Sequence, residues 1–159
     1  MQKLNILNSK EIKRLKELLV NQFNYSFQED YAYLETEKGK VYIISKDISK
    51  LDLDKLRIDR YGLYLGEKKG NTFRLSMEAS QLLFKEAKEN KVKLDNLFEL
   101  NEKEIREYFQ GMDIDKPELK EENKLVLLQF REDVFGCARL KEGKILNFLP
   151  KIHRGEAIV

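Results

Sequence analysis

The sequence is short of several residue types, and each shortage excludes a class of protein. Its 159 residues contain one cysteine, one histidine, two prolines and no tryptophan. A single cysteine rules out a disulfide framework, and one histidine with scattered carboxylates lacks the spacing of metal ligands. No apolar run approaches the roughly 18 residues of a membrane helix, and the first residues lack the apolar core of a signal peptide. We therefore expect a cytoplasmic protein with no metal, no cofactor and no membrane span.

Charge is plentiful and nearly balanced, with 30 basic and 28 acidic residues. The net charge of +2 excludes a protein that is basic over its whole surface. Counted by segment, however, the charges separate. Residues 95–122 hold ten acidic and four basic side chains, a net charge of −6. Residues 55–74 hold six basic and two acidic side chains, and residues 137–155 hold five and one, so each segment carries +4. Two such segments can supply one positive face in a folded chain.

The hydrophobic pattern predicts an α+β fold of two small units, with residues 1–89 in the first and residues 90–159 in the second. The first unit is expected to hold a helix, two antiparallel hairpins and another helix, which begin at Asn8 or Ser9, at residue 31, near residue 56 and at Ser76. The second helix, ending near residue 89, is expected to bury Met77, Leu82, Leu83 and Phe84.

The second unit reads as a helix followed by a β-meander. Asn101 and Glu104 form a capping box at the start of the helix, and Gly111 ends it. Three strands are expected after it, over residues 124–130, 134–140 and 144–150.

No catalytic motif is present. Cys137 falls within a predicted strand, where a small buried thiol is the expected outcome, and nothing in the sequence pairs it with His153. The chain has neither a GxxxxGK[ST] loop nor a GxGxxG turn after a strand. We therefore expect that the protein is not an enzyme.

The segment with the strongest functional signal is residues 135–155, FGCARLKEGKILNFLPKIHRG. It reads as a strand, a glycine turn, another strand and then Pro150, which stiffens the exit. Arginine and lysine at a strand end can grip phosphates, and the amide of Asn147 suits a base edge or a ribose.

This segment resembles the end of a PUA-type RNA-binding domain, in which a G-x-G-[KR] strand, a glycine turn and a [KR]-x-K-N-x-x-P-K-G-x-R ending follow one another. The matching residues are Gly136, Arg139, Gly143, Lys144, Asn147, Pro150, Lys151 and Arg154. The chain departs from the pattern at Ala138, Leu146 and Ile152. Upstream, YFQGMDI at 108–114 is similar to the motif that ends the first PUA helix, and residues 60–83 resemble part of a pre-PUA domain.

The two-part architecture is that of large-subunit ribosome-biogenesis PUA proteins and of the C-terminal module of RsmF-type RNA 5-methylcytosine methyltransferases. The resemblance implies a pre-PUA-like domain with a helix and an antiparallel sheet, and a C-terminal PUA-like pseudo-barrel. Those methyltransferases use two cysteines and an S-adenosylmethionine-binding glycine loop, and the chain has one cysteine and no such loop.

The first hypothesis is therefore a non-catalytic protein that binds structured RNA, rRNA or tRNA. It would position that RNA for an RNA-modifying enzyme or a ribosome-assembly factor. The expected RNA contacts are Arg139, Lys144, Asn147, Lys151 and Arg154, with a second contact from Lys68, Lys69 and Arg74.

The alternative is a protein-interaction adaptor with incidental RNA affinity. In that case the acidic segment 95–122, or the tyrosines Tyr31, Tyr33 and Tyr42, would bind a partner protein.

Overall fold

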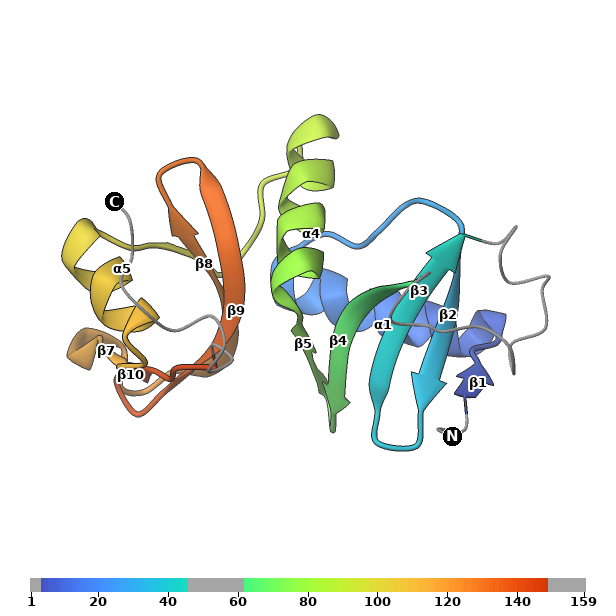
Figure 1. Ribbon diagram of the computed structural model, residues 1–159, viewed down its shortest axis with the longest axis horizontal. Coiled ribbons are helices and arrows are strands. Elements are labelled where there is room, and N and C mark those ends of the chain that lie inside the picture. Colours follow the sequence, from blue (N-terminus) through green and yellow to red (C-terminus); the bar gives the residue numbers. More distant parts are fainter. Residues whose placement is uncertain (1–3, 46–61, 149–159) are drawn as a thin grey trace. The chain divides into compact units, whose positions relative to one another are not determined.

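A computed structural model of the chain describes residues 4–45 and 62–148. Residue contacts fall into two compact units, Met1–Asp95 and Asn96–Val159, and each unit has its own five-stranded sheet (Figure 1). The mixed helix-and-sheet class is as predicted, whereas the division into domains 1–89 and 90–159 stays a prediction. In the described part of the chain, no helix is long and apolar enough to cross a membrane.

The first unit packs two helices against an antiparallel sheet with the strand order β1-β2-β3-β4-β5. The helices are α1 (Ser9–Phe23) and α4 (Met77–Glu89), and the strands are β1 (Leu4–Ile6), β2 (Tyr31–Thr36), β3 (Lys40–Ser45), β4 (Leu63–Lys69) and β5 (Thr72–Leu75). Both predicted hairpins are present in the described residues. Strand β4 extends through Lys69, into residues 67–71 that were expected to form the turn. The connector 46–61 lies outside the described residues.

Helix α1 begins at the predicted cap. The Asn8 side chain accepts from the Glu11 backbone N–H at 2.9 Å, and the Glu11 carboxylate accepts from the Asn8 N–H at 3.1 Å. Leu15, Leu19 and Phe23 are buried, which fixes this face of the helix against the sheet. In Figure 1, α1 crosses behind the strands.

Helix α4 buries a different face from the one expected. Ser76 caps it as predicted, accepting from the Ala79 N–H at 3.0 Å. The buried positions are Ala79, Ser80, Leu83 and Ala87. Met77, Leu82 and Phe84 are only half-buried, so their predicted burial is wrong. The physical reason is the i, i+4, i+8 row of small residues around Leu83, since small side chains let the helix backbone approach the sheet closely.

A β-bulge in the first sheet determines which side chains of β4 lie on each face of the sheet. Val41 pairs with Gly66 and Tyr42 pairs with Tyr64, so Leu65 has no residue opposite it on β3. Gly66 has φ +151°, and a Cβ there would lie 2.1 Å from the carbonyl oxygen of Arg74. A glycine is therefore required at the bulge.

The second unit is a helix beside a sheet that curls like half a barrel (Figure 1). The strand order is β6-β8-β9-β10-β7, with β6 parallel to β8 and the other pairs antiparallel. The elements are β6 (Leu97–Glu99), α5 (Glu102–Phe109), β7 (Ile114–Asp115), the 3-10 turn η2 (Pro117–Leu119), β8 (Asn123–Phe130), β9 (Asp133–Lys141) and β10 (Lys144–Ile145). This arrangement is consistent with a PUA-like fold.

The core of the second unit follows the predicted strands. Leu125, Val126, Leu127 and Leu128 are all at most 4% exposed, so β8 is covered on both faces. Cys137 is buried, as expected for a structural thiol. Helix α5 has the predicted capping box and ends before Gly111, which has φ +92°. The turn at Gly111 leads from α5 to β7, the edge strand of the sheet.

The last predicted strand is shorter than expected. The sequence indicated residues 144–150, whereas β10 covers Lys144–Ile145. The Leu146 N–H still donates to the Arg139 carbonyl at 2.8 Å. The next N–H, that of Asn147, donates to the Asp113 carboxylate at 2.8 Å instead of to a strand. The Asp113 carboxylate thus accepts from the N–H group that a longer strand would have paired with a neighbouring strand. Residues from 149 onward lie outside the described part.

Candidate nucleic-acid interface

The end of helix α5 and the chain after β10 form a tight junction. The side-chain amide of Asn147 donates to the carbonyl of Tyr108 at 2.7 Å and to that of Met112 at 2.9 Å. The Phe148 N–H donates to the Tyr108 hydroxyl at 3.4 Å. We call this cluster the Asn147 junction; it comprises Tyr108, Met112, Asp113, Asn147 and Phe148.

Asn147 therefore holds the fold together at the point where the sequence predicted an RNA contact. Its side-chain amide donates to the carbonyl of Tyr108 in the last turn of α5, which also accepts from the Gly111 N–H at 3.0 Å, and to the carbonyl of Met112 just after the helix. Its predicted contact with a base or sugar stays a prediction. What the sequence did not show is this positioning role, because it depends on Tyr108 and Met112, more than 30 residues away in the chain.

Three cations lie on one side of β9 and β10. Lys141 pairs directly with Lys144 across the turn, and Arg139 is two residues before Lys141 on the same side of the strand. The turn is Glu142-Gly143, with φ of +54° and +75°, as a two-residue hairpin turn requires. Arg139 and Lys144 were expected at this surface, and the register adds Lys141. The two-residue length of the turn is the signal that could have identified it.

Arg139 and Lys144 each have a polar partner among the described residues. The Arg139 guanidinium donates to the Asn123 side-chain oxygen at 3.1 Å. The Lys144 ammonium lies 3.9 Å from the Asp115 carboxylate, and the two side chains are 56% and 80% exposed. Such an exposed pair contributes little, roughly 0–1 kcal/mol, so it can open to bind an anion. Lys151 and Arg154 lie outside the described residues.

The candidates in the first unit lie at the tip and on one face of the β4–β5 hairpin. Lys68 and Lys69 are exposed next to the Gly70-Asn71 turn. The Arg74 guanidinium lies 3.4 Å from the Glu67 carboxylate on the neighbouring strand. The register puts Lys69 and Arg74 on one face and Lys68 on the other. The three predicted residues therefore do not lie on one face of the hairpin, and their RNA contact stays a prediction.

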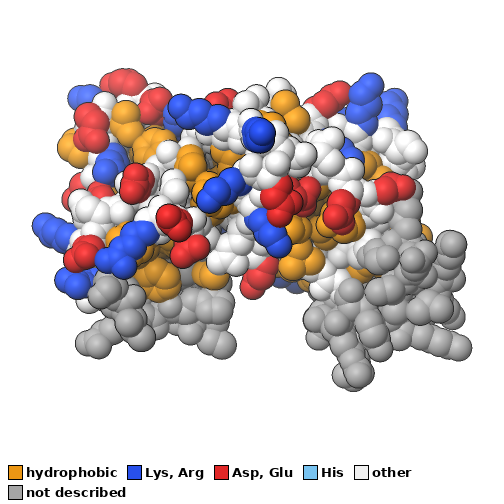
Figure 2. All heavy atoms as spheres, turned by 90° about the horizontal axis from the view of Figure 1, so that it is seen from above, with side chains coloured by type: hydrophobic (Ala, Val, Ile, Leu, Met, Phe, Trp, Pro, Cys, Tyr) orange, Lys and Arg blue, Asp and Glu red, His pale blue; other side chains and the backbone are white. Residues whose placement is uncertain are grey.

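The charges of the second unit are otherwise unfavourable for RNA. Residues 96–148 carry twelve acidic and nine basic side chains, a net charge of −3. Figure 2 shows basic and acidic side chains interleaved on the face that it presents, with no broad area of one sign. RNA binding by this unit would therefore depend on local clusters of cations such as the one on β9 and β10.

The acidic residues of α5 are largely engaged with basic neighbours. Glu102 lies 3.1 Å from Arg131, and Glu104 lies 2.8 Å from Lys116. Burial tends to raise the pKa of the Glu104 carboxyl, but hydrogen bonds from Lys116 and the Asn101 backbone outweigh it, so this pKa lies below its usual value. The acidic segment thus has structural roles in attaching the turn η2 to the helix.

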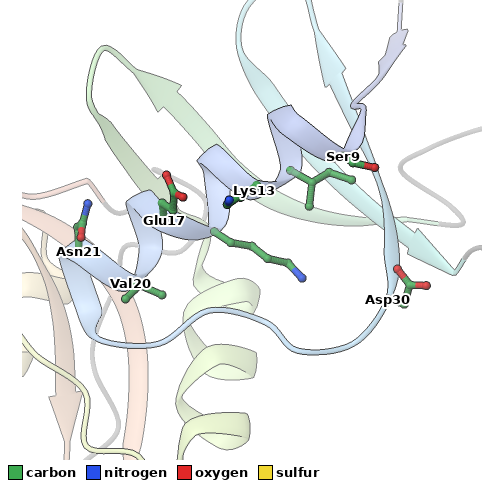
Figure 3. Close-up of a pocket in the computed structure, with 8 residues that line it drawn as sticks. Ser9, Lys13, Glu17, Val20, Asn21 and Asp30 are labelled. Atoms are coloured by element: carbon green, nitrogen blue, oxygen red, sulfur yellow. The ribbon is translucent and has the colours of Figure 1, made fainter.

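A groove of about 600 Å³ runs along α1 in the first unit (Figure 3). It is lined by Ser9, Ile12, Lys13, Lys16, Glu17, Val20, Asn21 and Asp30. Figure 3 shows Val20 on the side of α1 that faces the segment 24–30, which connects α1 to β2, and Asp30 at the far end of that segment. Two lysines and two carboxylates cancel, so this groove is not an anion site.

The tyrosines of the first hairpin have different environments. Tyr33 is only 2% exposed, and burial, followed by the nearby Glu86 carboxylate, raises its pKa to about 12. Tyr31 and Tyr42 are half-buried. Within residues 4–45 and 62–148, no three side chains of histidine, cysteine, aspartate or glutamate form a group that could hold a metal.

Comparison with known families identifies the second unit. Residues 95–154 match the family model described as the methyltransferase RsmF PUA domain. The match covers somewhat more than a third of the chain and includes α5, the Asn147 junction and the cations on β9 and β10. No curated protein matches the chain significantly. This part of the chain is thus similar to the PUA domain of RsmF, and the similarity suggests RNA binding.

Proposed function

We propose that this chain is a non-catalytic, cytoplasmic RNA-binding protein whose PUA-type unit binds structured RNA, either rRNA or tRNA. It would act in RNA modification or ribosome biogenesis by positioning the RNA for an RNA-modifying enzyme or a ribosome-assembly factor. The observation that supports this proposal most strongly is the family match over residues 95–154. The matched residues include Lys151 and Arg154, which fit the closing motif of the PUA-type family.

The geometry supports a binding strip that begins on the sheet. Arg139, Lys141 and Lys144 lie on one side of β9 and β10, and the ion pair of Lys144 with Asp115 is long and exposed, so a phosphate can replace the carboxylate. Asn147 follows directly and fixes the chain that leads to Lys151 and Arg154. In this proposal the three strand cations and the two later cations contact successive phosphates, and Asn147 has a positioning role.

The test is the salt dependence of RNA affinity, measured with the full chain and a tRNA or rRNA fragment. The logarithm of affinity should fall with the logarithm of salt by about 0.7–0.9 per phosphate contacted. A Lys151→Ala/Arg154→Ala double variant should bind more weakly, with its slope reduced by roughly 1.5.

The matched control is a Lys103→Ala/Arg106→Ala double variant, which also removes one lysine and one arginine. It removes the same charge from exposed positions in the acidic part of the second unit. Its affinity should fall much less. A folded Lys151→Ala/Arg154→Ala variant that binds RNA like the wild type would refute the assignment. A stoichiometric protein partner captured after nuclease treatment, without RNA affinity, would favour the adaptor hypothesis instead.

A further inference from the structure

One face of the first sheet carries two tyrosines beside several cations. Strand register places Tyr42 opposite Tyr64, and the neighbouring row on this face consists of Lys40, Glu67 and Arg74 across β3, β4 and β5. Side chains alternate along a strand, so Lys69 shares this face with Glu67. We call this surface the tyrosine face; it comprises Lys40, Tyr42, Tyr64, Glu67, Lys69 and Arg74.

The tyrosine face is opposite to the side of the sheet that holds the main core. Tyr42 packs against a small cluster of Ala32, Leu34 and Ile44. Its neighbours in the strand, Val41 and Ile43, point the other way and are 1% and 3% exposed. The rings of Tyr42 and Tyr64 have centroids 5.2 Å apart and planes inclined at 44°. Both side chains are half-buried, so each ring keeps part of its surface accessible.

The bulge in β4 is what brings the second tyrosine to this face. Without the extra residue Leu65, strict alternation from Glu67 would turn Tyr64 to the opposite side. Gly66 makes the bulge possible, because any Cβ there would collide with the carbonyl of Arg74. The aromatic pair therefore depends on a specific departure from regular strand geometry.

The charge of the tyrosine face favours an anion. Three cations oppose one carboxylate, and that carboxylate, Glu67, is paired with Arg74 at 3.4 Å. Lys40 and Lys69 form no ion pair within the part of the chain that the structure describes. Three rows of side chains follow one another along the strands: the tyrosine pair, then the row of Lys40, Glu67 and Arg74, and then Lys69. Successive rows are two residues apart, which is about 7 Å.

An aromatic pair next to regularly spaced cations matches the two parts of a nucleotide. A base can stack on a tyrosine ring, and phosphates can bind the lysines. An acidic peptide would use the cations but not the ring faces. We propose that the tyrosine face binds an unpaired nucleotide of the RNA, with its base on Tyr42 and Tyr64 and its phosphates at Lys40 and Lys69. This inference rests on the RNA binding proposed above and names the single-stranded part of the ligand.

The experiment compares two RNAs bound to the full chain: a blunt hairpin and the same hairpin with a short single-stranded extension. The wild type should bind the extended RNA roughly 5- to 150-fold more tightly, the range that stacking of one base gives. Tyr64→Leu should lose this advantage and keep its affinity for the blunt hairpin, whereas Tyr64→Phe should retain both. Phe130→Leu, which removes a half-buried ring from the second unit, is the control and should change neither.

Each outcome decides the inference. If the wild type binds neither RNA, the proposed function fails and the inference fails with it. If both RNAs bind equally, or if Tyr64→Leu keeps the full advantage, only the inference is wrong. Should Tyr64→Leu not fold, Lys69→Ala decides, because this exposed side chain can be removed without disturbing the core; it should weaken binding of the extended RNA alone and lower its salt slope by about 0.7. Loss of a protein partner in Tyr64→Leu with unchanged RNA binding would also overturn the inference.

Discussion

Replacing Asn147 by alanine tests whether the Asn147 junction stabilises the second unit. The substitution removes two side-chain hydrogen bonds, to the carbonyls of Tyr108 and Met112 at 2.7 and 2.9 Å. Each hydrogen bond contributes about 0.5–1.5 kcal/mol net, and the Tyr108 carbonyl keeps its bond from the Gly111 N–H when the asparagine is removed. The bond to Tyr108 is partly buried and the bond to Met112 is exposed, so we expect a loss of about 2 kcal/mol.

The assay must report on the second unit alone, because the chain has two compact units that can unfold separately. Urea unfolding followed by the amide NMR signals of β8 and β9 meets this requirement. Asn123→Ala is the matched control, since the side-chain oxygen of this exposed asparagine accepts a hydrogen bond from Arg139, and its loss should cost less than about 0.5 kcal/mol. A loss below about 0.5 kcal/mol in Asn147→Ala would refute the positioning role.

Three further predictions concern stability. Lys116→Met should destabilise the second unit by about 1 kcal/mol at pH 7, and the difference should shrink as the pH falls through the lowered pKa of Glu104, because a carboxyl stabilised in its charged form loses that contribution on protonation. Equal losses at pH 7 and pH 3 in urea titrations would contradict this. Gly66→Ala should cost about 2 kcal/mol or more, whereas Gly136→Ala, with no atom within 4 Å of the added Cβ, should cost less than about 1 kcal/mol; similar melting temperatures would refute the bulge geometry. Burial raises the pKa of the Glu86 carboxyl, so ionising it costs stability as the pH rises; Glu86→Gln should therefore gain stability at pH 7 and gain little at pH 4, and the opposite pH trend would disprove the assignment.

Local signals in the sequence located most elements correctly. The capping boxes at Asn8 and Asn101, the cap at Ser76 and the glycine after α5 satisfy backbone groups within a few residues, so the sequence carries the complete signal. Periodicity likewise identified the first hairpin, because alternating residues in β2 and β3 face a core and a small second cluster. These predictions needed no tertiary information.

Features that depend on distant residues were missed. The parallel pairing of β6 with β8 and the two-residue strand β7 are set by contacts across the second unit. The face buried by α4 depends on how closely the helix approaches the sheet, and the short β10 depends on the Asp113 carboxylate. The role of Asn147 was obscured for the same reason. The hydrogen-bond partners of Asn147 lie 35 and 39 residues earlier in the chain, so the residues next to it give no sign of its role.

The candidate interface could be predicted in part. The motif over residues 135–155 predicted a PUA-type unit, and the family match to residues 95–154 agrees with it. The motif also named Arg139 and Lys144, which the strand register places on a common side of the sheet. Lys141 was overlooked because its alignment with Lys144 depends on the length of the turn. The cations on the β4–β5 hairpin lie on two faces, which a count of charges along the sequence does not show.

The most direct test of RNA binding is to crosslink the full chain to a structured tRNA or rRNA fragment with ultraviolet light and to identify the crosslinked peptides by mass spectrometry. The proposal predicts that peptides spanning residues 139–154 are crosslinked, and that the Lys151→Ala/Arg154→Ala double variant strongly reduces their yield. Crosslinks found only in the acidic segment 95–122, or none at an RNA concentration that saturates a PUA-type domain, would contradict it.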